Sequence, residues 1–178
     1  FQTIGSAIAV AAKHYAEVRG FPKRSGGEDF YLLNKLAKTG AINKLQEPEI
    51  IIEARQSDRV PFGTGPAISK LLFEKNIQQA KIFYHPQIFI SLKTWLDTMA
   101  MSQTHKLNEL PLPASTLQAL QSIDASKAIE AARKVSNSPQ SYIKHMHTWF
   151  DAFKTLKFVH SLRDKSYPNV SLHEISNS

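Results

Sequence analysis

Residues 25–40 read Ser-Gly-Gly-Glu-Asp-Phe-Tyr-Leu-Leu-Asn-Lys-Leu-Ala-Lys-Thr-Gly. The glycine pair, Gly26 and Gly27, delivers two adjacent carboxylates, Glu28 and Asp29, to the first turn of a predicted amphipathic helix. Acidic side chains are favoured at a helix N-terminus by its unpaired N–H groups and its dipole. Capping of the helix is therefore one interpretation of this pair, and chemistry at an adjoining site is the other.

The segments around this helix alternate between strand and helix patterns. Apolar side chains follow the helical period over 28–38, and Gly40 stands where a C-terminal cap is expected. The isoleucine run after Pro48 has the stiffness and β preference of a buried strand. The sequence predicts strands over 3–10, 41–45 and 49–54, and a short helix over 13–18.

Beyond a proline- and glycine-rich loop over 55–66, the pattern becomes entirely helical. Helices are predicted over 67–79, 86–101, 115–123, 125–135 and 139–162, with Asp124 and Ser138 as N-caps and Pro139 at a first helical position. We therefore predict an α+β fold, with a small β-sheet in an α/β part over 1–66 and a mainly helical extension over 67–178 packed on it. Because the first part is too small to fold alone, one continuous body is expected.

The composition restricts the class of protein. A hydrophobic content of 42% with 21% charged residues excludes a generally disordered chain, and no apolar run reaches the length of a membrane span, so a soluble protein is expected. The absence of cysteine excludes disulfides and thiolate metal sites and fits a reducing cytosol. The net charge of +7 attracts anionic partners, but its basic residues are diffuse. Nucleic acid is therefore not an expected partner, and binding through net charge alone is the weakest hypothesis.

A resemblance emerges from several motifs in order. They are Gly5-Ser6, Arg19-Gly20-Phe21-Pro22, Gly26-Gly27-Glu28-Asp29-Phe30, and then Leu33, Leu36 and Gly40. In this order they resemble the second half of the family 2 nucleotide-sugar glycosyltransferases, which have the GT-A fold. The match covers about residues 3 to 54. The resemblance implies that residues 1–66 are the acceptor-side part of a GT-A-like domain.

The resemblance also implies a reaction. A sugar would pass from a nucleoside diphosphate to an acceptor hydroxyl with inversion, and Asp29 would be the general base that takes the hydroxyl proton. Glu28 would position the acceptor or support the helix start, because adjacent helical residues point about 100° apart and cannot share one role. Gly26 and Gly27 would form the substrate-side turn.

Departures from the family pattern limit this expectation. Ala7 stands where the family often has asparagine, and the chain contains no Asp-x-Asp motif. The donor half, with its Mg or Mn site, is therefore expected elsewhere in a longer protein, and this portion alone is expected to bind no metal and to be inactive. His145 and His147 are two apart on a predicted helix and cannot chelate one metal together. We interpret all the histidines as surface or satisfied polar groups.

The loop over 55–66 offers a second candidate for substrate binding. Arg55 and Arg59, with glycine N–H groups nearby, are suited to the oxygens of a diphosphate. Arg59 is equally suited to a surface ion pair with Asp58 or Glu53. Both interpretations stay open at this point.

The partners follow from the reaction. We expect a nucleotide-sugar donor and a glycan or lipid-linked acceptor in cell-surface polysaccharide synthesis, with a cytoplasmic location, peripheral contact to the inner membrane and a homo-oligomer formed through the helical region. The alternative is a helical protein-interaction module without catalytic activity, in which Glu28 and Asp29 only cap a helix.

Overall fold

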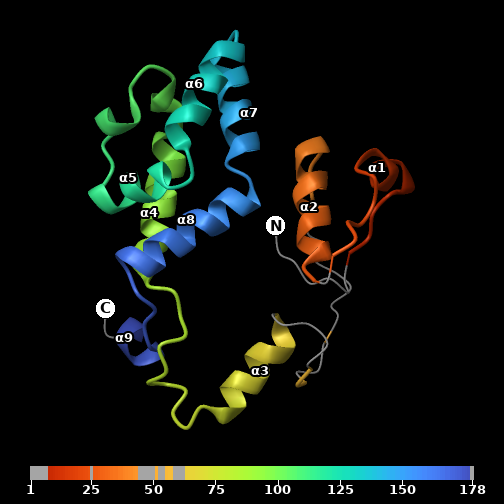
Figure 1. The fold of residues 1–178 in the computed structure, drawn as a ribbon, viewed down its shortest axis with the longest axis vertical. Helices are drawn as coiled ribbons and strands as arrows, with labels where there is room; N and C mark the ends of the chain where they lie inside the picture. The colour runs from red at the N-terminus through yellow and green to blue at the C-terminus, as the bar shows by residue number, and fades with distance from the viewer. Residues whose placement is uncertain (1–7, 25, 44–50, 52–54, 58–62, 177–178) are drawn as a thin grey trace. The chain divides into compact units, whose positions relative to one another are not determined.

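The computed structural model describes residues 8–24, 26–43, 51, 55–57 and 63–176. The chain divides into two compact units, residues 1–75 and 76–178 (Figure 1). The described α-helices of the first unit are α1 Ala12–Glu17, α2 Glu28–Thr39 and α3 Thr64–Phe73. Those of the second are α4 Pro86–Thr98, α5 Ala114–Gln121, α6 Ala125–Val135, α7 Pro139–Trp149, α8 Ala152–Lys165 and α9 Leu172–Ser176, with 3-10 helices η1 Met99–Gln103 and η2 Leu107–Glu109.

The predicted α+β fold is wrong, because the structure is helical. No described residue belongs to a strand, and β pairing in this part of the chain is limited to an isolated antiparallel bridge between Phe83 and Val170. Ile8, Val10 and Ile42, from two predicted strands, pack instead against the leucine face of α2. Small and β-branched apolar side chains cover a helix as readily as they line a sheet, so composition alone misled the prediction. The third predicted strand, apart from exposed Ile51, lies outside the described residues.

The core of the first unit forms where α1 meets α2. Val18, just after α1, is buried with Leu32, Leu33 and Leu36 of α2. The ammonium group of Lys35 donates to the carbonyl of Val18 at 3.1 Å, which ties the end of α1 to the middle of α2. The two helices predicted in this region are confirmed, and α2 begins at the expected residue.

The ends of α2 and α3 depend on glycine in different ways. Gly27 precedes α2 with a left-handed φ of 70°, whereas Gly40, which is the C-cap of α2 as predicted, has an extended φ of −175°. Gly63 precedes α3 with φ of 100°. Helix α3 ends at Phe73 and not near residue 79, where the backbone instead makes a turn. In that turn the Asn76 side chain accepts from the Gln79 N–H at 3.3 Å.

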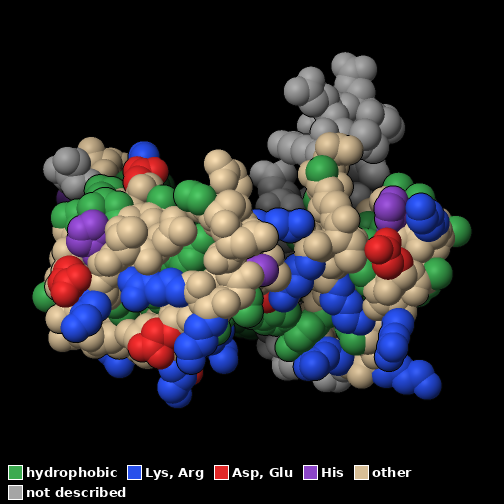
Figure 2. Space-filling model, turned by 90° about the horizontal axis from the view of Figure 1, so that it is seen from above, with side chains coloured by type: hydrophobic (Ala, Val, Ile, Leu, Met, Phe, Trp, Pro, Cys, Tyr) green, Lys and Arg blue, Asp and Glu red, His purple; other side chains and the backbone are tan. Residues whose placement is uncertain are grey.

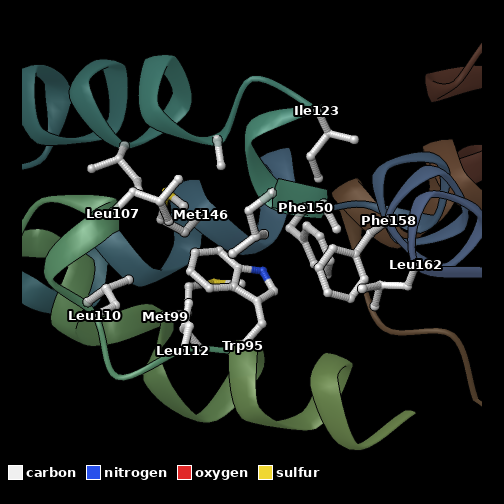
Figure 3. Close-up of a cluster of buried hydrophobic side chains, with 14 of the residues drawn as sticks. Trp95, Met99, Leu107, Leu110, Leu112, Ile123, Met146, Phe150, Phe158 and Leu162 are labelled. Carbon is white, nitrogen blue, oxygen red and sulfur yellow. The ribbon is translucent and has the colours of Figure 1, made fainter. Parts of the chain in front are cut away.

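The second unit is a bundle around one apolar core. Helix α8 packs against α4 and α5, while α6 and α7 lie side by side as an antiparallel pair (Figure 1). Trp95 of α4, fully buried, lies among Met99, Met146, Phe150 and leucines from the η1–α5 segment (Figure 3). Its ring contacts the Phe150 ring edge-on, with 6.0 Å between the two ring centroids. Aromatic and aliphatic side chains from several segments of the second unit therefore converge on one tryptophan.

The predicted single helix over 139–162 is wrong, because it is two helices. Helix α7 ends at Trp149, Phe150 leaves helical geometry, and Asp151 starts α8 by accepting from the N–H groups of Phe153 (3.0 Å) and Lys154 (3.1 Å). The apolar period continues across the break and hides it. The side-chain cap at Asp151 was the sequence signal for the break.

The caps predicted for α6 and α7 differ in outcome. Ser138 accepts from the N–H of Ser141 at 3.1 Å, and Pro139 is the first residue of α7, as predicted. Asp124 stands at the N-cap position of α6 but is left-handed, with φ of 65°, and its carboxylate binds Lys127 and not the helix amides.

Within the described ranges, no helix has both the length and the apolar character needed to cross a bilayer.

Candidate functional site

The two carboxylates of the Gly-Gly-Glu-Asp segment lie in the first turn of α2, as the sequence predicts. The N–H of Phe30 donates to Oδ1 of Asp29 at 2.7 Å, so part of this carboxylate does act locally on the helix start. Its second oxygen, Oδ2, has no hydrogen-bond partner within the described residues. The carboxylate is thus oriented by one oxygen and open at the other.

Glu28 has a different environment from its neighbour. Its side chain is exposed and makes no hydrogen bond or ion pair to any residue that the structure describes, whereas Asp29 is half-buried. Burial and a fixed hydrogen bond restrict the Asp29 carboxylate, while the Glu28 carboxylate keeps its rotational freedom. The geometry therefore separates a positioned acid from a mobile one.

The backbone before α2 explains one glycine of the pair. Gly27 has positive φ, which a side chain would strain, and its carbonyl accepts from the N–H of Tyr31 at 3.1 Å to begin the helix. Gly26 is half-buried and does not belong to the residues with positive φ. The turn that presents Asp29 thus requires glycine at Gly27.

Arg24 holds the loop onto the second turn of α2. Its guanidinium lies over the Tyr31 ring, 3.9 Å from the centroid, and its Nη1 donates to the Tyr31 hydroxyl at 3.1 Å. This contact fixes the approach of the chain to Gly27 and brings a positive charge close to the start of the helix. Sequence reasoning did not identify either residue, because their pairing depends on the path of the loop between them.

The Arg19-Gly20-Phe21 segment is a tight corner built on Tyr15. Arg19 and Gly20 both have positive φ, 60° and 64°. A Cβ on Gly20 would lie 2.7 Å from Cζ of Tyr15, and the Tyr15 hydroxyl accepts from the Phe21 N–H at 3.3 Å. The phenol ring therefore covers the backbone at Gly20, where a side chain would have to displace it, and this corner turns the chain back toward the start of α2.

The predicted diphosphate residues are not brought to this site by any contact in the described chain. Arg55 is exposed and makes no hydrogen bond or ion pair with another described residue. A Cβ on Gly65 would lie 2.5 Å from the Ser57 carbonyl oxygen, so the segment that carries Arg55 passes close to α3. Arg59, with its alternative partners Asp58 and Glu53, lies outside the described residues.

The described histidines offer no metal centre. In the described ranges no group of three or more His, Cys, Asp or Glu side chains could hold an ion. His85 caps α4 by accepting from the Gln87 N–H at 3.1 Å, and His160 pairs with the Tyr84 hydroxyl at 3.0 Å. His145 departs from our interpretation, because its Nε2 is buried without a hydrogen-bond partner among the described residues.

Comparison with known proteins gives no family for this chain. No family model matches the sequence, and neither the curated proteins nor the solved structures include a significant match. The functional argument therefore depends on the residues and their geometry.

Proposed function

We propose that this chain supplies the acceptor side and the catalytic base of an inverting glycosyltransferase that uses a nucleoside-diphosphate sugar. The proposal depends on the different environments of the two Asp29 carboxylate oxygens. Oδ1 accepts a hydrogen bond from the Phe30 N–H at 2.7 Å, whereas Oδ2 has no hydrogen-bond partner among the described residues. A general base needs both a fixed orientation and a free oxygen within reach of the proton that it accepts.

The proposed step transfers one proton and exchanges one bond. The acceptor hydroxyl oxygen attacks the anomeric carbon from the face opposite the diphosphate, the bond from that carbon to the diphosphate oxygen breaks, and the hydroxyl proton moves to Oδ2 of Asp29. Exposed Glu28 is free to bind another acceptor hydroxyl. The start of α2 is fixed by Arg24 on Tyr31, which limits the movement of the base.

The leaving diphosphate requires groups that this site does not offer. A divalent ion, Mg²⁺ or Mn²⁺, would neutralise its charge in the complete enzyme. Among the described residues no group of three or more His, Cys, Asp or Glu side chains could hold such an ion. The resemblance to the glycosyltransferase family places the metal in the donor half of a longer enzyme, and we derive no step from it. Arg55, exposed and unpaired within the described residues, is the proposed diphosphate contact from this chain, together with Arg59.

The biological setting is part of the same proposal. A glycan or lipid-linked acceptor for a cell-surface polysaccharide would be modified on the cytoplasmic side, with the enzyme peripheral to the inner membrane. The positive net charge of +7 supports contact with anionic lipid or donor. Figure 2 shows Lys and Arg side chains spread over the face that it presents, with fewer acidic side chains among them.

One observation favours the alternative of a helical interaction module. Helix α4 exposes Phe89 and Ile90, at 52% and 54%, on a second unit that has its own core. Exposed adjacent apolar side chains are typical of protein contact surfaces. In that case Asp29 would only cap α2, and its replacement would leave function unchanged.

The test is Asp29→Asn in the complete protein that carries a donor half. Asparagine keeps the size and the acceptor oxygen for the Phe30 N–H but cannot take a proton. We expect kcat to fall by about 10² to 10⁴, with the Kd of the donor unchanged. Glu28→Gln is the matched control, because it removes the adjacent charge and should lower kcat less than about tenfold. Normal turnover in Asp29→Asn would remove this carboxylate from the mechanism.

A further inference from the structure

The C-terminal end of α3 exposes large apolar side chains. Leu72 is 68% exposed and Phe73 is 83% exposed. We call these two residues the apolar tip. Isolated exposed apolar residues are ordinary on protein surfaces, but two large adjacent ones at the end of one helix form a larger apolar surface.

Positive charges stand on both sides of the apolar tip. Lys70 and Lys75 are exposed, and neither makes an ion pair with another described residue. Glu74 is the acidic residue between the two unpaired lysines. The surface around the tip is therefore net positive, which selects an anionic partner.

This combination has the chemistry of a membrane-interface anchor. Lysine stems lie along apolar groups while their ammonium ends reach lipid phosphates, and Leu and Phe side chains enter the boundary between headgroups and acyl chains. At ten residues, α3 is about 15 Å long, too short to cross a bilayer. Its apolar residues gather at one end, which suits insertion of the tip alone.

A second copy of the chain fits the same surface poorly. In a symmetric dimer through the apolar tip, Lys70 and Lys75 of one copy would approach the same lysines of the other. Like charges placed across an interface disfavour association. An anionic lipid surface, in contrast, can accept the apolar side chains and bind the lysine ammonium groups at the same time.

We propose that the apolar tip, Leu72 and Phe73, inserts into an anionic membrane surface, with Lys70 and Lys75 binding lipid phosphates. This inference is independent of the proposed catalysis, because vesicle binding is measured without donor or acceptor. It assigns the peripheral membrane contact to one helix end.

The first experiment compares binding of the full chain to two kinds of vesicle by co-sedimentation. Vesicles of phosphatidylcholine mixed with phosphatidylglycerol should bind the chain at least about tenfold more tightly than pure phosphatidylcholine, and added salt should weaken binding. The double variant Leu72→Glu with Phe73→Glu should lose at least about tenfold in partition. Lys70→Glu with Lys75→Glu should remove the preference for the anionic vesicles.

The matched control carries the same change of charge elsewhere. Ile90→Glu with Val135→Glu replaces two exposed apolar residues of the second unit, 54% and 65% exposed. It should change partition by less than about threefold. Equal loss in both double variants would mean that net charge alone drives binding, and it would overturn the assignment to the apolar tip.

A second measurement tests insertion directly. Phe73→Trp places an indole at the tip, in addition to the natural Trp95, which is fully buried, and Trp149, which is half-buried, so the wild-type emission is subtracted. Its added fluorescence should shift to the blue on anionic vesicles and be quenched by brominated acyl chains. No shift, or unchanged binding of Leu72→Glu with Phe73→Glu, would overturn the proposal. So would a wild-type dimer that the same double variant dissociates without lipid, because the occupant would then be a second copy.

Discussion

At the scale of single residues, Gly20 combines a left-handed backbone with an aromatic ring packed over it. Its φ of 64° strains any side chain, and a Cβ would meet the Tyr15 ring at 2.7 Å from Cζ. The same corner holds Phe21 through the Tyr15 hydroxyl. One glycine therefore secures the return of the chain toward α2 and its carboxylates.

Replacement of this glycine should loosen the first unit. Gly20→Ala combines backbone strain with a clash, and we expect a loss of about 1 to 3 kcal/mol in the stability of the α1–α2 contact. Amide hydrogen exchange in α2, measured by mass spectrometry, should become faster by the factor to which this loss of free energy converts. Gly40→Ala is the matched control, since Gly40 has extended φ of −175° and no atom within 4 Å of its added Cβ. Equal exchange in Gly20→Ala and wild type would contradict the role of the corner.

The residue scale also shows how far sequence reasoning reaches. The pattern places Glu28 and Asp29 in the first turn of a helix, because capping preferences are local. It cannot show that Phe30 occupies only one oxygen of Asp29, nor that Arg24 stacks on a tyrosine seven residues later. Those contacts depend on χ angles and loop path, which no short-range rule specifies.

At the scale of elements, the junction of α7 and α8 is held from both sides. Phe150 is buried, and its ring contacts the rings of Trp95 and Phe158 edge-on, with centroid distances of 6.0 Å and 5.9 Å. Asp151 supplies the cap immediately after it. Burial of the ring turns the chain out of α7, and the cap satisfies amides at the start of α8.

Loss of this cap should weaken the second unit measurably. Asp151→Ala leaves the N–H groups of Phe153 and Lys154 without their carboxylate partner, so we expect a loss of about 1 kcal/mol in unfolding free energy. Urea denaturation, monitored by circular dichroism, measures this free energy of unfolding. The control is Asp164→Ala on the same helix, where the carboxylate is exposed and its pair with Arg163 should contribute much less to stability. Similar losses in the two variants would show that the cap adds nothing particular.

The elements also show why the strands were predicted wrongly. Long periodic segments such as α2 and α6 were placed correctly because burial repeats along them. A strand needs a partner from elsewhere in the chain, and a short apolar run cannot specify one. Ile8 and Val10 satisfy the same apolar pattern by covering α2. The mistaken fold class follows from this ambiguity.

At the scale of the whole molecule, contacts distant in sequence close the second unit. The Phe83–Val170 bridge and the His173 N–H bond to the Gln78 carbonyl join its beginning to its end, and the Ser115–Tyr167 pair joins its middle to its end. Tyr84 and His160 add a further link, with 3.0 Å between the hydroxyl and Nε2. Sequence patterns gave no indication of this closure, because it depends on pairs separated by most of the unit.

The Tyr84–His160 link makes the closure sensitive to acid. Burial lowers the pKa of His160 below its ordinary value of about 6.5, and the nearby Arg163 acts in the same direction. Because the unfolded chain binds the proton more readily, this contribution to stability is complete above about pH 6.5 and is lost as the pH falls through the lowered pKa. Thermal unfolding at a series of pH values should show a decrease in Tm on the acid side that His160→Gln reduces. A variant whose Tm follows pH as steeply as wild type would assign the acid sensitivity to other groups.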